Sequence, residues 1–272
     1  MKALVTNDDG IEAPGLRAVV RELQRVMGVA VIAPQQEQSG RGASITIGQP
    51  IKVNKVTPEL SGVETYAVEG TPSDCVIVGI RSLFSGKIDL VVSGINRGPN
   101  IGHDIFVSGT VGAALQGYLR GIPSLAVSIS AYEDLNFEAA ARLVTSLASK
   151  IKNGALPKEI LLNINLPNLP PEEILGIEIT ELSRQSYCDA VEKDRDCEEA
   201  CYRIRRNNKD KDSYYAALGT DIWALQQGKA SITALFNSSV ACASRTYLQS
   251  MVPSIFSDLR NSQKLNCNVA AG

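Results

Sequence analysis

The fold of this chain is most constrained by short apolar runs that alternate with helical spacings of apolar residues over its first two thirds. The clearest apolar runs lie at 2–6, 29–33, 88–93 and 124–128, and each has the length of a buried strand. Strands that alternate with helices predict a parallel sheet, because each helix returns the chain to the same edge before the next strand. We therefore expect an α/β fold, in which helices cover both faces of a mostly parallel sheet.

The other elements are predicted from the same periodicities and from the positions of glycine and proline. We expect further strands at 45–53, 64–68, 160–164, 177–182 and 229–235. We expect helices at 16–26, 71–84, 110–119, 137–151, 219–225 and 254–265. The stretch 192–212 is densely charged and has little periodicity, so we expect a solvated loop or a mobile flap there.

The turn after the first apolar run holds two adjacent acids, Asp8 and Asp9, between Asn7 and Gly10. Parallel sheets bind ligands beyond the carboxyl ends of their strands, which is where this turn lies. Adjacent carboxylates repel each other unless a cation or a proton lies between them, and their oxygens suit Mg²⁺ or Mn²⁺. Gly10 permits the tight turn that brings both side chains inward. The alternative is an ordinary Asp- and Asn-rich turn without a ligand.

Three more polar segments lie at 39–44, 93–104 and 108–114, and the first two follow apolar runs. Serine hydroxyls and asparagine amides offer neutral oxygens to a metal, and glycines leave backbone N–H groups open to an anion. The third segment opens a helix, whose first N–H groups attract phosphate. The candidates in these segments are Ser39, Gly40, Asn96, Asn100, Ser108 and Thr110. Taken separately, a flexible loop or simple capping of the helix by Ser108 explains them as well.

Composition excludes several classes of protein. Lys and Arg number 27 against 29 Asp and Glu, so no basic field would attract nucleic acid. No apolar run is long enough for a membrane helix, and the amino terminus does not look like a signal peptide. We therefore expect a cytoplasmic protein with reduced cysteines. His103 is the single histidine, which excludes any zinc site that needs a histidine pair.

Several ordered motifs make the chain resemble the SurE survival protein family of 5′(3′)-nucleotidases. They cover most of residues 1–185 in the expected order, whereas the charged segment 185–213 matches poorly. The motifs are TNDDGI (6–11), AP with SG (33–34 and 39–40), GTPSDC (70–75), VSGIN (92–96), GPNIG (98–102), SGTV (108–111), LNINLP (162–167) and GTD (219–221).

The resemblance implies a phosphatase that hydrolyses nucleoside 5′- and 3′-monophosphates and perhaps short polyphosphate. It implies one divalent cation per subunit, such as Mg²⁺ or Mn²⁺, on the metal ligands Asp8, Asp9, Ser39 and Asn96. The expected catalytic residues are Asp8, Asp9 and Asn96. The expected phosphate contacts are Asn7, Ser39, Gly40, Asn100, Ser108, Gly109 and Thr110.

The same resemblance implies how the chain is organised. Residues 1–185 are expected to form a Rossmann-like catalytic core, and residues 186–272 a C-terminal β/α extension. That extension is expected to exchange between the subunits of a homodimer or homotetramer.

Three other readings of the same residues remain open. A covalent phospho-aspartate is disfavoured because haloacid-dehalogenase-type phosphatases separate their two acids by one residue, and Asp8 and Asp9 are adjacent. A dinucleotide-binding module would carry G-x-G-x-x-G after the first strand, where this chain has two acids. A regulatory protein that keeps the fold without activity is the third reading.

For hydrolysis itself, we expect Asp8 to orient or deprotonate the attacking water and Asp9 to be a ligand of the metal. The two roles could also be reversed.

Overall fold

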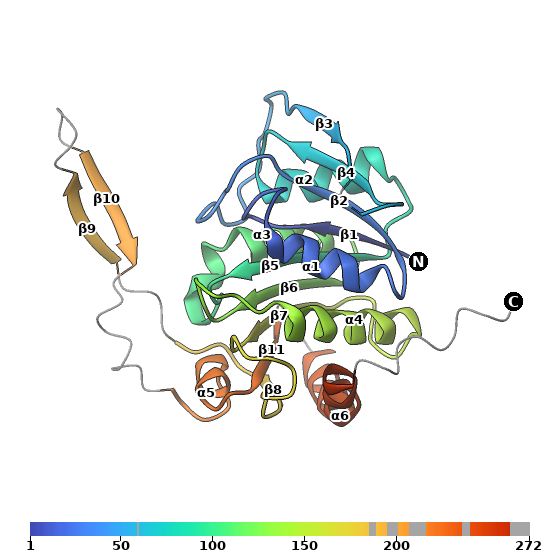
Figure 1. Cartoon of the computed structure of the whole chain (residues 1–272), viewed down its shortest axis with the longest axis vertical. Helices are drawn as coiled ribbons and strands as arrows, with labels where there is room; N and C mark the ends of the chain where they lie inside the picture. The colour runs from blue at the N-terminus through green and yellow to red at the C-terminus, as the bar shows by residue number, and fades with distance from the viewer. Residues whose placement is uncertain (59, 185–188, 195–200, 207–215, 236–239, 262–272) are drawn as a thin grey trace, which may run out of the picture.

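A computed structural model describes the chain except for residues 59, 185–188, 195–200, 207–215, 236–239 and 262–272 (Figure 1). In this described part, one sheet of nine strands forms the centre of the molecule. The strands lie in the order β3 (Val53–Val56), β4 (Glu64–Val68), β2 (Gly28–Pro34), β1 (Lys2–Thr6), β5 (Leu90–Arg97), β6 (Ser124–Ile129), β7 (Leu161–Leu166), β11 (Ala230–Leu235) and β8 (Ile177–Thr180).

The sheet is mostly parallel, as the alternating sequence pattern predicted. Only β3 against β4 and β7 against β11 pair antiparallel among its neighbouring strands. The central strands β1, β5 and β6 are buried almost throughout, because apolar side chains point to both faces. In register, Thr6 of β1 lies beside Ser93 of β5, so the polar residues that follow both strands reach the same edge of the sheet.

Helices cover both faces of the sheet (Figure 1). On one face, α1 (Pro14–Leu23) and α4 (Glu138–Lys152) pack their apolar sides onto the strands, and α6 (Val240–Arg260) packs against α4. On the other face lie α2 (Pro72–Val78) and α3 (Gly109–Tyr118). The remaining helical elements are η1 (Gly79–Leu83), η2 (Gly102–Phe106) and α5 (Asp221–Gln226). The predicted fold class is therefore confirmed.

Two helix starts confirm the capping residues read from the sequence. Thr71 accepts a hydrogen bond from the backbone N–H of Asp74, whose side chain accepts one from the backbone of Thr71. Ser108 caps α3 by accepting a hydrogen bond from the N–H of Val111. The helix predicted over 71–84 changes at Gly79 into the wider turns of η1.

Two predicted boundaries were wrong. The strand expected at 45–53 forms only from Val53 onward, because Ile45 and Ile47 are exposed and the segment is tied to α2 instead. The backbone N–H of Thr46 donates to Asp74 at 2.9 Å, which replaces a strand partner. The last helix begins at Val240 rather than at residue 254, and residues 262–265 of the predicted helix lie outside the described part.

The charged segment was expected to be a solvated loop or a mobile flap; the structure describes strands there instead of a loop, and the flap stays a prediction. The antiparallel strands β9 (Asp189–Asp194) and β10 (Cys201–Arg206) form a hairpin that stands apart from the main sheet (Figure 1). In β10, Tyr202 and Ile204 alternate with arginines, and Ile204 lies opposite Val191 of β9, whose own apolar residues are adjacent. A period of two in one short strand within a densely charged segment gave too weak a signal to predict a strand. Cys201 is disulfide-bonded, which also contradicts the expectation of reduced cysteines for that residue.

The proposed C-terminal extension is continuous with the core where it is described. β11 pairs with β7 and β8 in the main sheet, and α6 packs against α4. The division at residue 185 stays a prediction. Among the described helices, none combines the length and apolar content that a membrane span requires.

Replacing Gly15 by Ala should destabilise the fold by about 1–3 kcal/mol, because a Cβ there would overpack α1 against β5. The added carbon would lie 2.1 Å from the carbonyl oxygen of Ile95. Urea unfolding followed by circular dichroism measures the change. Gly28→Ala is the control, since its Cβ would meet nothing nearer than 3.6 Å. Equal stability of the two variants would contradict this packing.

Candidate active site

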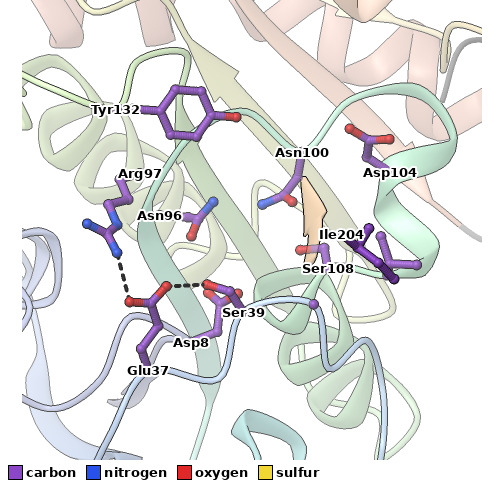
Figure 2. Close-up of a pocket in the computed structure, with 12 residues that line it drawn as sticks. Asp8, Glu37, Ser39, Asn96, Arg97, Asn100, Asp104, Ser108, Tyr132 and Ile204 are labelled. Atoms are coloured by element: carbon purple, nitrogen blue, oxygen red, sulfur yellow. Dashed lines mark hydrogen bonds and ion pairs between the residues drawn. The ribbon is translucent and has the colours of Figure 1, made fainter. Parts of the chain in front are cut away.

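A cavity of about 400 Å³ opens at the carboxyl ends of the central strands (Figure 2). It is lined by residues from the loops that follow β1, β2, β5 and β6 and by the start of α3. Six of the residues singled out in the sequence line it: Asp8, Ser39, Gly40, Asn96, Asn100 and Ser108. The structure therefore brings together side chains from four separate segments of the chain.

The turn after β1 places Asp8 beneath the start of α3. Asp8 is only 4% exposed, and Thr110 donates a hydrogen bond from Oγ1 to its Oδ1 at 2.5 Å. Gly109 leaves room for this carboxylate, since a Cβ at that position would lie 2.9 Å from the Cβ of Asp8. Gly10 has a φ of +100°, which confirms that the tight turn needs glycine. Asn7 supports the turn by donating from Nδ2 to the carbonyl of Gly10 at 2.9 Å.

Asp9 points to the side, toward Arg97, and does not line the cavity. The backbone N–H of Arg97 donates to Asp9 Oδ2 at 3.4 Å, and the guanidinium Nε lies 3.4 Å from Oδ1. Asn7, Gly109 and Thr110 are also absent from the cavity lining. These four predicted site residues therefore lie outside the cavity lining and contact other residues of the protein. They are Asn7, Asp9, Gly109 and Thr110.

Burial sets the charge state of the two acids. Removal from water raises the pKa of Asp8 to about 6; the hydrogen bond from Thr110 opposes the rise and the charge of Asp9 adds to it. Burial also raises the pKa of Asp9, while the hydrogen bond and charge of Arg97 act to lower it. Among the residues that the structure describes, no cationic side chain contributes to the shift at Asp8, and a bound cation would favour its charged form.

The other candidate metal ligands present neutral oxygens. Asn96 donates from Nδ2 to the carbonyl of Gly98 at 2.7 Å, so its amide oxygen faces away from that bond. Ser39 donates from Oγ to Glu37 at 2.8 Å, so its lone pairs remain available. In the described part of the chain, no three His, Cys, Asp or Glu side chains gather as a metal site. The oxygens that line the cavity come from the Asp8 carboxylate, the Ser39 hydroxyl and the Asn96 amide, with Asp9 next to them in the turn, and such donors suit a hard cation such as Mg²⁺ or Mn²⁺.

A buried network of asparagines holds Asn100 in the cavity wall. The carbonyl oxygen of Asn100 accepts from the side-chain amides of Asn163 and Asn165 at 2.8 and 2.9 Å. Its backbone N–H donates to Asn165 Oδ1, and its Nδ2 donates to Ser128. The LNINLP motif therefore acts on the cavity from β7 by fixing the backbone of the loop that follows β5. This fixed position suits a group that contacts a substrate oxygen.

Six lining residues were missed by the sequence reasoning. They are Glu37, Arg97, Asp104, Val107, Tyr132 and Ile204. Glu37 and Arg97 lie within two residues of Ser39 and Asn96, so proximity in sequence was a usable signal. Tyr132 follows β6, and the rule that strand ends carry the site would have found it. Ile204 comes from the hairpin, which was not predicted as structure. His103 is exposed and does not line the cavity.

Comparison with known proteins finds similar sequences and a similar solved structure. The family described as "Survival protein SurE" matches residues 3–189. A protein named 5′-nucleotidase SurE from Dehalococcoides mccartyi (strain CBDB1) is 46% identical over 237 residues, which cover 86% of this chain and 88% of the relative. Its counterpart from Moorella thermoacetica is 45% identical over 86% of this chain and 90% of its own length. The crystal structure of the SurE protein from Aquifex aeolicus, 38% identical, superposes with a TM-score of 0.73 over 92% of this chain and all of the other.

Replacing Asp8 by Asn should stabilise the chelator-treated protein at pH 8, because the amide brings no charge into the buried turn. The pKa of Asp8 is about 6 when folded against 3.8 for a free carboxyl. Its ionisation therefore opposes folding above about pH 6 and has no effect below about pH 4, where both states are protonated. We expect the Tm of the variant to exceed that of the wild type by roughly 5 °C at pH 8 in calorimetry. The gain should vanish toward pH 4, and a gain that is equal at both pH values would argue against a buried charge.

Proposed function

This chain belongs to the SurE family, and we propose that it is a metal-dependent phosphatase that hydrolyses nucleoside 5′-monophosphates to nucleoside and phosphate. The observation that carries the proposal is the cavity beside Asp8, where a buried carboxylate meets neutral oxygen ligands and the start of a helix. The relatives named 5′-nucleotidase support the choice of substrate. Nucleoside 3′-monophosphates and short polyphosphate are further substrates that we propose for the same cavity.

We propose that Asp8, Asp9, Ser39 and Asn96 hold one divalent cation. All four offer oxygen atoms, and the raised pKa of Asp8 is the cost that a nearby cation would offset. Asp9 lies next to Asp8 in the turn. One of its carboxylate oxygens would bind the ion while the other keeps its contact with Arg97. When bound, such an ion lowers the pKa of a water ligand and offsets negative charge on the phosphoryl oxygens.

On the other side of the cavity we propose the phosphate contacts. Ser108 and Gly40 line the cavity, and Ser108 is the N-cap of α3, whose positive dipole end would favour an anion beside it. Asn100 is fixed by its asparagine network close by. In this arrangement Asn7, Gly109 and Thr110 act by holding the turn after β1, which shapes the same subsite.

The proposed role of Asp8 follows from its hydrogen bonds. The side chain of Thr110 donates to Oδ1 and its backbone also bonds this carboxylate, which holds Asp8 at the edge of the cavity that it lines. Because Asp8 borders the cavity, its carboxylate would accept a proton from an attacking water there. Asp9 and Asn96 complete the catalytic set by holding the ion, with the roles of Asp8 and Asp9 still interchangeable.

We also propose that the chain works as a homodimer or homotetramer in which the C-terminal region is exchanged between subunits. The hairpin of β9 and β10 supports this, because Val191, Tyr202 and Ile204 are more than half exposed on it. Apolar side chains that project into water are commonly covered by a partner surface. A second copy of the chain would cover them.

The proposed phosphatase activity predicts that phosphate release depends on a divalent cation and on Asp8. Wild-type protein should release phosphate from nucleoside monophosphates with Mn²⁺ or Mg²⁺ and lose that activity in EDTA. Asp8→Asn should lower kcat by about a thousandfold or more, because the water loses its base and the ion loses a charged ligand. A malachite-green assay across nucleotides and metals measures both effects.

Asp89→Asn is the matched control for this substitution. Asp89 lies at the opposite end of β5, where its carboxylate accepts a hydrogen bond from the backbone of Lys2. The control should keep the activity of the wild type. Near-normal turnover by the Asp8 variant with metal present would overturn the assignment, and a phosphorylated enzyme trapped during turnover would replace it with a covalent route.

A further inference from the structure

We propose that Glu37 and Arg97 orient the side chains of two proposed metal ligands: Glu37 contacts Ser39, and Arg97 contacts Asp9. Neither residue is needed as a ligand itself. This inference rests on the proposed function, because it concerns how the same site is held ready for its ion. The two residues form a chain of contacts along one wall of the cavity (Figure 2).

The chain of contacts runs from one acid to the serine through two side chains. Arg97 reaches Asp9 through Nε at 3.4 Å and Glu37 through Nη2 at 2.8 Å. The other oxygen of Glu37 accepts the hydroxyl proton of Ser39 at 2.8 Å. The loop that carries Ser39 is also tied to the first acid, because the backbone N–H of Gln38 donates to the carbonyl of Asp8 at 2.7 Å. One guanidinium therefore connects the turn after β1 with the loop after β2.

The contact with Glu37 decides what Ser39 can offer. A serine hydroxyl has one proton and two lone pairs, and its rotation is otherwise free. When the proton is donated to Glu37, the lone pairs are turned away from that carboxylate and can bind a cation. Without Glu37, the hydroxyl could rotate to donate to Asp8 or to phosphate and would lose its lone-pair direction. Glu37 thus fixes the serine as an acceptor.

Arg97 has a parallel role at Asp9. Its backbone N–H and side chain both approach this carboxylate, which is 10% exposed. The planar guanidinium can hold two carboxylates at once, which an ammonium group on a flexible chain does poorly. It also pairs with Glu37, whose negative charge otherwise raises the pKa of Asp9, so the guanidinium offsets part of the repulsion between these two acids.

A simple surface ion pair is the alternative explanation. The side chains of Glu37 and Arg97 are about half exposed, so their pair adds little to folding stability. Lys52 and Glu69 form a similar pair at 2.9 Å outside the lining of the cavity, with Glu69 exposed to the same 48% as Glu37. The two pairs differ in their neighbours, since the pair at the cavity contacts Ser39 and Asp9. A positioning role must therefore appear in metal binding and not in stability.

The first experiment measures Mn²⁺ binding to nucleotide-free, chelator-stripped protein by isothermal titration calorimetry. Glu37→Ala should weaken binding about tenfold, as expected for a residue behind a metal ligand. Glu69→Ala is the matched control and should bind like the wild type. An unchanged Kd for Glu37→Ala, or an equal loss in the control, overturns the inference.

Loss of a nearby negative charge would also weaken cation binding, so two variants separate the causes. Glu37→Gln removes the charge but keeps an oxygen that accepts from Ser39, and its Kd should stay closer to the wild type than to Glu37→Ala. Arg97→Met removes a positive charge, which on electrostatics alone would tighten Mn²⁺ binding. Positioning predicts weaker binding instead. Tighter binding by Arg97→Met, or a Glu37→Gln variant as weak as Glu37→Ala, contradicts the proposal.

A double-mutant cycle tests whether Glu37 acts through Ser39. In the Ser39→Ala background, Glu37→Ala should cause no further loss of Mn²⁺ affinity, because the hydroxyl it orients is gone. The full tenfold loss in that background would overturn the inference. If the wild type itself binds no Mn²⁺, both the proposed metal-dependent function and the positioning role of Glu37 fail. If the wild type binds Mn²⁺ and the Glu37 variants bind equally well, only the positioning role fails.

Discussion

Asp8 and Asp9 stand side by side at the end of β1, where the sheet, the start of α3 and the loop after β2 shield them from water. Two neighbouring carboxylates in such a place repel each other and lose hydration. Arg97 compensates Asp9, while Asp8 receives hydrogen bonds from the side chain of Thr110 and from backbone N–H groups. The charge of Asp8 is left without a counter-ion among these contacts, and this imbalance is the physical basis for the ion that we propose.

The parallel sheet makes this arrangement possible with short local segments. β1 and β5 are neighbours in register, so the turn after Thr6 and the loop after Ser93 arrive at the same edge. β2 pairs with the other side of β1 and brings Ser39 to the cavity. Each loop supplies a few polar side chains, while buried strands and helices hold the loops in place. The asparagines of β7 extend the same principle, since they fix Asn100 from beneath.

The parts that the sequence predicted are those governed by local pattern. Buried strands such as β1 and β5 show as apolar runs, and the Thr71 capping box shows as a motif. The hairpin was missed because only β10 alternates apolar and charged residues, and it does so briefly within a densely charged segment. Glu37 and Arg97 were missed because their contact joins residues 60 positions apart in the chain, and no local pattern reports such a pair. Long-range polar contacts depend on the folded arrangement, which a single sequence read locally does not contain.

The central claim is that the acids at the end of β1 hold a divalent cation. Anomalous diffraction from a crystal soaked in manganese tests it most directly, because the scattering identifies the element and its position. The account predicts one strong manganese peak within bonding distance of oxygens from Asp8, Asp9, Ser39 and Asn96. A well-ordered crystal that shows those side chains clearly, with no manganese peak beside the turn, would contradict it.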